Sequence, residues 1–60
     1  MRVCQDGAQF YSEDSGELVY TSPQHVTDIY DMRGAELARV DFLAYALAEL
    51  GLSAHQIEFC

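Results

Sequence analysis

The sequence predicts an α+β domain in which a small antiparallel sheet, made of a three-stranded N-terminal meander and a possible C-terminal strand, packs on one or two helices. Three observations favour this fold. Turn-forming residues divide the first third into short β-prone segments, the second half has apolar residues at helical spacing, and the last residues alternate between apolar and polar. The chain has 60 residues, so we expect residues 1–60 to form a single domain that buries only about 60% of its unfolded surface.

Two turns are expected to divide the first third of the chain into three strands. Asp6-Gly7 is typical of a two-residue hairpin, because a type I′ turn needs positive φ at both central positions. It would join strands over residues 1–5 and 8–12. Residues 13–16 form a second turn cluster, in which Gly16 can take the left-handed position. They predict a second turn, followed by a third strand over residues 17–21, where branched and aromatic side chains favour β structure.

The middle and second half of the chain have a helical pattern. Ser22-Pro23 is typical of a helix start, because serine caps the helix and proline suits its first position. This predicts a helix over residues 23–32. Residues 35–50 contain alanines and leucines in an amphipathic pattern, which predicts a second helix. Gly34 lies between the two, so one kinked helix remains an alternative to the two helices that we favour.

The C-terminal end begins with a helix stop. Gly51 is expected to end the second helix in the left-handed conformation, with Leu52 packing back against the helix. In the tail over residues 54–60, apolar and polar residues alternate, which favours a final strand. A short helix capped by Ser53 is the alternative for the same segment.

The predicted core follows one apolar stripe along the helices and the inward side of the strands. Tyr20 and Tyr45 are expected to be mostly buried. The core candidates are Leu18, Tyr20, Val26, Ile29, Leu37, Val40, Leu43, Leu47, Leu50, Ile57 and Phe59.

The cysteine pattern and the hydropathy indicate a cytoplasmic protein. Cys4 and Cys60 lie near opposite ends of the sequence and form no C-x-x-C pair. We therefore expect free thiols, as is usual in a reducing cytosol, although a disulfide could form on oxidation if the first and last strands were neighbours. Polar residues follow Met1 within a few positions, so no targeting segment is expected. The apolar-rich stretch 40–50 is too short and too charged to span a bilayer.

Charge is the strongest pointer to function. Ten acidic residues stand against three arginines, with no lysine, and the net charge is −7. Half of the residues are hydrophobic, so the chain is expected to fold, unlike a disordered acidic segment. Proteins bind nucleic acid by neutralising phosphates with Lys and Arg, which excludes direct nucleic-acid binding here. We expect the partner to be a basic nucleic-acid-binding protein or complex. Arg33 and Arg39 are expected to pair with neighbouring carboxylates.

Catalytic chemistry is not predicted. The sequence has no G-x-S-x-G, phosphate-binding loop or dinucleotide fingerprint. His25 and His55 do not stand at metal-ligand spacing with a cysteine or a carboxylate. We therefore expect no catalytic residue, cofactor or metal, and no enzyme.

The acidic residues form two groups that could contact a basic groove. One group lies on the second β-turn. The other shares a face of the first helix, where residues three apart are about 5–6 Å from each other, near the spacing of successive phosphates. A tyrosine lies beside each group and could stack on arginine. The candidate partner-binding residues are Tyr11, Glu13, Asp14, Glu17, Asp28, Tyr30 and Asp31. The alternative is a solvated acidic face that only keeps the protein soluble.

Two segments stand out beside the small size, the charge and the lack of lysine: the acidic turn Glu13-Asp14-Ser15-Gly16-Glu17 and the stretch His25-Val26-Thr27-Asp28-Ile29-Tyr30-Asp31. In these features the chain resembles the small acidic anti-CRISPR proteins of phages and mobile elements. The chain is most similar to inhibitors of type I systems, several of which imitate DNA. The resemblance implies binding to the Cascade surveillance complex and exclusion of target DNA, with the site that reads the protospacer-adjacent motif as one candidate position. It also implies a cytoplasmic protein of a bacterial host, and we expect a monomer.

Two other functions remain open. The helix over residues 35–50 could be a dimerisation or partner-docking face of a small adaptor, with the acids serving solubility only. The same DNA mimicry could also inhibit a nuclease. Phe42 separates the first alternative from the acidic surface: an exposed Phe42 favours an apolar interface, whereas a Phe42 packed under the sheet favours the acidic face.

Overall fold

The computed structural model describes residues 1–23 and 32–60, and it confirms the α+β class. The helix predicted over residues 23–32, with Val26 and Ile29 of the expected core, lies almost wholly outside the described residues. The elements in chain order are β1 (Arg2–Asp6), β2 (Gln9–Ser12), β3 (Leu18–Thr21), α1 (Met32–Tyr45), the π-helical turn η2 (Ala46–Leu50), the 3-10 turn η3 (Ala54–Gln56) and β4 (Glu58–Phe59).

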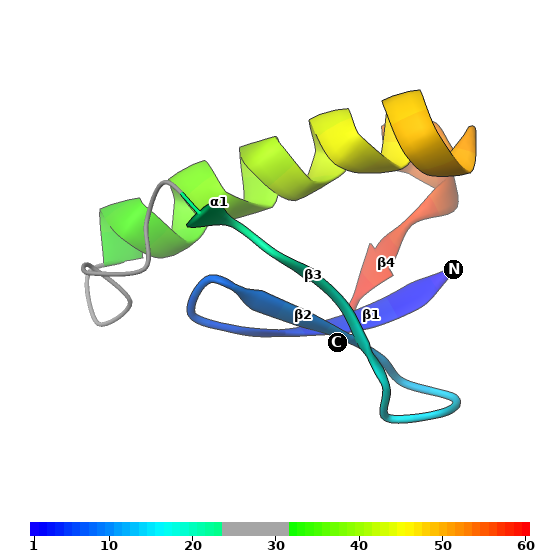
Figure 1. Ribbon diagram of the computed structural model, residues 1–60, viewed down its shortest axis with the longest axis horizontal. Helices are drawn as coiled ribbons and strands as arrows, with labels where there is room; N and C mark the ends of the chain where they lie inside the picture. The colour runs from blue at the N-terminus through cyan, green and yellow to red at the C-terminus, as the bar shows by residue number, and fades with distance from the viewer. Residues whose placement is uncertain (24–31) are drawn as a thin grey trace.

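The sheet has the strand order β3-β2-β1-β4. The predicted meander is confirmed, because β2 pairs antiparallel with both β1 and β3. β4 is also present, but it pairs parallel with β1, so the sheet is mixed and the expectation of a wholly antiparallel sheet was wrong. The reason is that α1 lies between β3 and β4: it carries the chain back along the sheet, and β4 then enters in the direction of β1. Figure 1 shows α1 along one side of the sheet, and no other described helix covers the opposite side.

The first hairpin differs by one residue from its prediction. β1 and β2 pair up to Asp6 and Gln9, so the turn residues are Gly7 and Ala8. Only Gly7 has positive φ, at 61°, which matches a type II′ turn with glycine at its first central position and not a type I′ turn. The second turn agrees with its prediction, because Gly16 is left-handed with φ of 73°.

The core lies between α1 and the sheet, and the helix turns a different face to it than predicted. Phe10 and Phe42 are fully buried and stack with their centroids 4.6 Å apart. The aromatic rings of the sheet fill most of this space, so the helix positions beside Phe42 hold alanines that allow a close approach. The buried apolar residues are Val3, Ala8, Phe10, Ala38, Phe42, Ala46 and Ile57.

The predicted core was therefore partly wrong. Ile57 is buried, and Tyr20, Leu43, Tyr45 and Phe59 are partly buried and pack against the core. The core candidates that the structure exposes are Leu18, Leu37, Val40, Leu47 and Leu50, at 41–64% of their surface.

The helix is continuous in the part that the structure describes. Gly34 is buried inside α1, so the break expected near it does not occur. The helix continues through η2 and ends at Gly51, which is left-handed with φ of 68°. The backbone N–H of Leu52 donates to the carbonyl of Ala46 at 3.1 Å, which confirms the predicted helix end. No helix among the described residues is both long and apolar enough to cross a membrane.

The tail contains both of the alternatives that its sequence allowed. Ser53 caps the short turn η3, and its backbone N–H donates to Oε1 of Gln56 at 2.9 Å. Ile57 then turns into the core, and β4 follows immediately.

A partly buried polar cluster attaches β3 and the residue after it to α1. The hydroxyls of Tyr20 and Ser22 donate to Oδ2 of Asp41 at 3.0 and 2.7 Å. Tyr20 also stacks on Tyr45, with ring centroids 4.4 Å apart. Burial, and then the hydrogen bond to this carboxylate, raise the pKa of Tyr20 above its usual 10.0.

The two cysteines form a disulfide, so the prediction of free thiols was wrong. Cys4 lies in β1 and Cys60 directly follows β4, and their Cα atoms are 5.0 Å apart. The parallel pairing of β4 with β1 brings them together, since the Cys60 N–H donates to the Val3 carbonyl at 3.0 Å. The condition for a disulfide, neighbouring first and last strands, is thus met.

Candidate functional site

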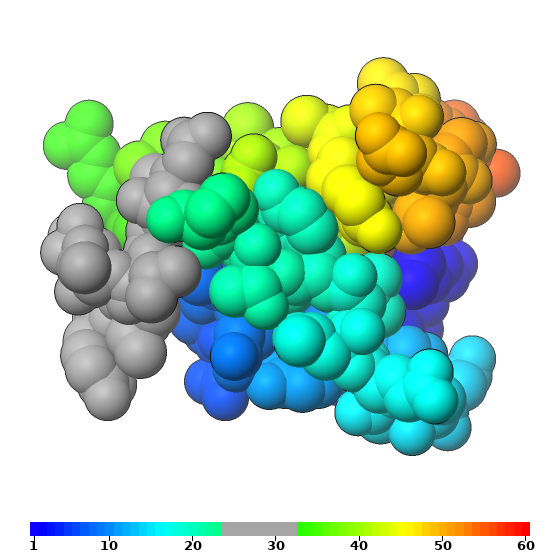
Figure 2. All heavy atoms as spheres, in the orientation of Figure 1, coloured from blue at the N-terminus to red at the C-terminus, as the bar shows by residue number. Residues whose placement is uncertain are grey.

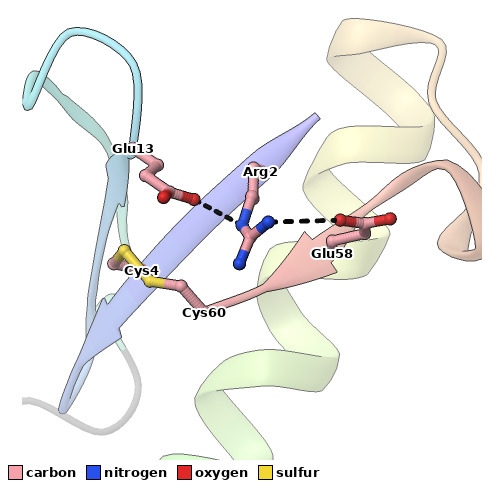
Figure 3. Close-up of a disulfide and its surroundings, with 5 residues drawn as sticks. All are labelled: Arg2, Cys4, Glu13, Glu58 and Cys60. Carbon is pink, nitrogen blue, oxygen red and sulfur yellow. Dashed lines mark ion pairs between the residues drawn. A yellow bond between two sulfur atoms is a disulfide. The ribbon is translucent and has the colours of Figure 1, made fainter.

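One face of the sheet packs on α1, and Glu13 is the predicted acidic residue that lies on the other, the open face. Successive side chains of a strand point to opposite faces. Val3 points into the core, so its neighbours in β1 point outward, and the partner strands follow the same alternation. Figure 3 shows the result: Arg2, Cys4, Glu13, Glu58 and Cys60 meet at one edge of this face, although they come from three segments of the chain.

Arg2 is the cation of this group. Its guanidinium forms an ion pair with Glu13, and a longer one with Glu58, with 4.0 Å between Nη1 and Oε2. The side chains of Arg2 and Glu13 are 57% and 43% exposed, so the pair contributes no more than about 1 kcal/mol to stability. The backbone of Glu13 is nevertheless held beside β1, because its N–H donates to the Arg2 carbonyl at 3.1 Å.

The acidic turn, residues 13–17, is closed by backbone hydrogen bonds. The N–H of Ser12 donates to the Glu17 carbonyl at 2.9 Å, and the N–H of Gly16 donates to the Ser12 carbonyl at 2.8 Å. The turn projects from the body of the molecule at the lower right of Figure 2. Asp14 and Glu17 are exposed there, and within residues 1–23 and 32–60 their carboxylates have no hydrogen bond or ion pair.

Tyr11 lies on the open face next to this turn. It is half-buried in β2, opposite Cys4 of β1, and its hydroxyl donates to Oε1 of Gln9 at 2.7 Å. Because residues two apart in a strand share a face, Tyr11 presents its ring on the side where Glu13 points.

The structure brings four of the predicted residues together at one end of the sheet: Tyr11, Glu13, Asp14 and Glu17. The other three, Asp28, Tyr30 and Asp31, lie outside the described residues. Sequence reasoning missed Arg2 and Glu58. The only signal for them was the alternation of β1 and β4, which helps only once the pairing of the two strands is known.

α1 carries a second candidate surface on its outer side. Phe42 is fully buried under the sheet. A buried Phe42 was the condition expected to favour the acidic surface over an apolar helix interface. The same rotation of the helix, however, turns a row of apolar residues to solvent, because residues two or five positions from Phe42 fall on the opposite side of the helix. This helix band consists of Leu37, Val40, Ala44 and Leu47, all of which are exposed.

A shallow hollow of about 260 Å³ lies between β1 and α1, lined by Gln5, Ala35, Glu36 and Arg39. Gln5 Nε2 donates to the Ala35 carbonyl at 2.7 Å. Arg39 was expected to pair with a carboxylate, but its guanidinium lies 4.2 Å over the Phe59 ring and donates to Gln5 Oε1 at 3.4 Å. The side chain of Gln5 thus bonds to both Ala35 and Arg39 across the hollow, and this arrangement does not point to a ligand.

No protein-family model matches the chain, and no curated protein or solved structure is significantly similar to it.

Proposed function

We propose that the protein is an acidic inhibitor that occupies the nucleic-acid groove of a basic protein complex. The observation that carries the proposal is the acidic turn: Asp14 and Glu17 are exposed and have no partner among the described residues. The resemblance to small anti-CRISPR proteins makes type I Cascade the first complex to test, and would place the protein in the cytoplasm of a bacterial host.

The energetics of such contacts favour carboxylates without internal partners. A carboxylate that is already paired must give up its cation before it can bind another, whereas Asp14 and Glu17 give up only water. Glu13 differs, because Arg2 already neutralises part of its charge. We therefore expect the last two acids of the turn to contribute more to binding than Glu13.

The net charge of −7 adds a long-range attraction to any positive groove. Opposite fields accelerate association, and salt weakens the effect because the Debye length falls to about 8 Å at physiological ionic strength. Tyr11 would supply a ring beside the turn on which an arginine of the partner could stack.

A competition assay tests the proposal. Purified Cascade and labelled target DNA are mixed with the protein at low and moderate salt, and DNA binding is measured. We expect loss of DNA binding that weakens as salt rises. The double change Asp14→Asn/Glu17→Gln should weaken inhibition about tenfold, equivalent to about 1.4 kcal/mol. The control Glu49→Gln removes one exposed charge at the far end of the helix and should have little effect.

Either of two results would contradict the proposal. Undisturbed DNA binding would remove Cascade as the partner, and the same assay with a nuclease and its substrate would then test the nuclease-inhibitor alternative. Inhibition that is equally strong at both salt concentrations would contradict charge mimicry itself.

A second candidate function, self-association through the helix band, is favoured by the exposure of Val40 and Leu47 at 64% and 62%. The band is symmetric about position 42. If two copies paired their helices antiparallel about that position, Leu37 would face Leu47 and Val40 would face Ala44 of the other copy. Each of these contacts would then occur twice, once from each copy, which is the self-complementarity that an isologous two-fold interface requires.

The strength of such a dimer can be bounded. Burying the exposed half of a leucine or valine contributes about 1 kcal/mol, so the six large residues of two bands contribute about 6 kcal/mol. Association costs about 4–15 kcal/mol, so the pair is weak at best. Sedimentation equilibrium at high concentration tests it: Val40→Lys should abolish a dimer, and a strictly monomeric wild type would exclude this function.

A further inference from the structure

Three potential metal ligands meet on the open face of the sheet. The sulfurs of Cys4 and Cys60 and a carboxylate oxygen of Glu13 all lie within 4.8 Å of one another. Figure 3 shows them on one side of the sheet, with the disulfide next to the Arg2–Glu13 ion pair. They come from β1, from the residue after β4 and from the residue after β2, so only the folded sheet brings them together.

We propose that the reduced form of the protein binds one Zn²⁺ through the thiolates of Cys4 and Cys60 and the carboxylate of Glu13, with water as the fourth ligand. Thiolate sulfur and carboxylate oxygen are both common ligands of zinc, which prefers four in tetrahedral geometry. Two thiolates on one zinc lie about 3.8 Å apart, given Zn–S bonds of about 2.3 Å. Cysteines with Cα atoms 5.0 Å apart reach this separation by rotation of their side chains.

The chemistry balances as two separate steps. A dithiol or phosphine reductant supplies two electrons to the disulfide and is itself oxidised, and the two sulfurs take up two protons to become thiols. Zn²⁺ then displaces both protons to solvent and binds the thiolates, so binding strengthens as pH rises through the thiol range. Disulfide and metal exclude each other, because each uses both sulfurs.

Arg2 competes with the metal for Glu13. Its guanidinium must leave Glu13 before that carboxylate can bind a dication. Glu58 offers an alternative partner, since its Oε2 already lies 4.0 Å from Nη1 of Arg2. With the metal bound, three positive charges from Zn²⁺ and Arg2 would face four negative charges from the two thiolates and the two glutamates, so the site remains electrostatically compensated.

The test uses Zn²⁺ alone, titrated against a chromophoric chelator, with the full chain either oxidised or reduced by a phosphine. We expect one zinc per chain in the reduced form and none in the oxidised form. Cys4→Ser should abolish binding. Glu13→Gln should weaken it at least tenfold, whereas the control Glu17→Gln, which removes the same charge from the same turn, should not change it.

Arg2→Gln provides a test with the opposite sign. Removing the competing cation should tighten zinc binding, whereas a nonspecific attraction of zinc to the acidic surface would change little. Circular dichroism of the reduced chain with and without zinc shows whether binding is coupled to folding. If Cys4→Ser fails to fold, the pair Glu13→Gln and Glu17→Gln still decides, because both residues are exposed.

The proposal is overturned by any of three results: binding that is equal in Glu13→Gln and Glu17→Gln, binding of similar strength in the oxidised form, or one zinc shared between two chains. It does not depend on the proposed inhibition, which is tested without metal in the oxidised form.

Discussion

The rotation of α1 about its axis can be tested with one pair of substitutions. Phe42 is fully buried and Leu47 is 62% exposed, although the apolar stripe of the sequence placed Leu47 in the core and left the burial of Phe42 open. Truncating a buried phenylalanine to alanine costs about 3–5 kcal/mol. A 60-residue chain has about 3–9 kcal/mol in total, so Phe42→Ala should remove at least about a third of its stability. Leu47→Ala should cost less than about 0.5 kcal/mol.

The contacts of Phe42 explain the size of this loss. Its ring stacks on Phe10 and lies within 6.3 Å of three further rings, those of Tyr20, Tyr45 and Phe59. Each such pair contributes about 0.5–1.5 kcal/mol beyond the buried area.

Urea denaturation followed by circular dichroism measures both variants. Phe42→Leu, expected to cost about 1–2 kcal/mol, keeps the comparison possible if Phe42→Ala does not fold. A larger loss for Leu47→Ala than for Phe42→Leu would refute the helix orientation, and with it the solvent exposure of the helix band.

Three further predictions concern single features of the fold. The pKa of Tyr20 is raised in the folded protein, so its contribution to stability is full below pH 10 and is lost as pH rises through the folded pKa. The urea concentration at the unfolding midpoint should therefore fall over this pH range. The fall should be smaller in Tyr20→Phe, which has no hydroxyl to titrate. Gly51→Ala should cost about 1 kcal/mol, and lower the melting temperature by about 4–8 °C, because an L-residue is strained at φ of 68° although no atom lies within 4 Å of its Cβ. Reduction of the disulfide should lower the free energy of unfolding by about 4 kcal/mol, from the loop closed by cysteines 56 positions apart.

Matched variants control these measurements. Tyr11→Phe should leave the alkaline fall in stability unchanged, because Tyr11 bonds only to an exposed glutamine in the described part of the chain. Gly16→Ala, also at positive φ and in open space, should cost about as much as Gly51→Ala; a cost for either that is near zero would contradict the strain argument. If a Cys4→Ser/Cys60→Ser double variant were as stable as the oxidised wild type, it would contradict the argument that the disulfide stabilises the fold by restricting the unfolded chain.

Local features of the chain could be predicted because neighbouring residues determine them. The left-handed Gly16 and Gly51, the meander and the tail after Ser53 all depend on short-range preferences. The acidic turn belongs to the same class, so its exposed carboxylates could be named before the fold was known.

The orientation of α1 could not be predicted in the same way, because the helix is apolar on two sides. Leu37, Val40 and Leu47 form the more hydrophobic row, and counting apolar residues selects it. The sheet selects the other row, Ala38–Phe42–Ala46, since the rings of the strands leave room to bury only one large side chain of α1 completely, and Leu43 and Tyr45 pack at its margin. That choice depends on the volume of residues far away in the sequence.

The pairing of β4 with β1 escaped prediction for a related reason. The direction of a strand is not encoded within its two residues; it follows from the path of α1, which precedes β4. The disulfide, the second partner of Arg2 and the proposed zinc ligands all depend on this one pairing.

The same pairing should determine how the chain folds in time. The two hairpins join residues that are close in sequence and can form within microseconds. β4 must find β1 across almost the whole chain, and the entropy of closing so long a loop has to be overcome before its few backbone bonds form. We therefore expect docking of β4 to limit the folding rate of the reduced chain, and an intact cross-link to make refolding faster by holding the two strands close in the unfolded ensemble.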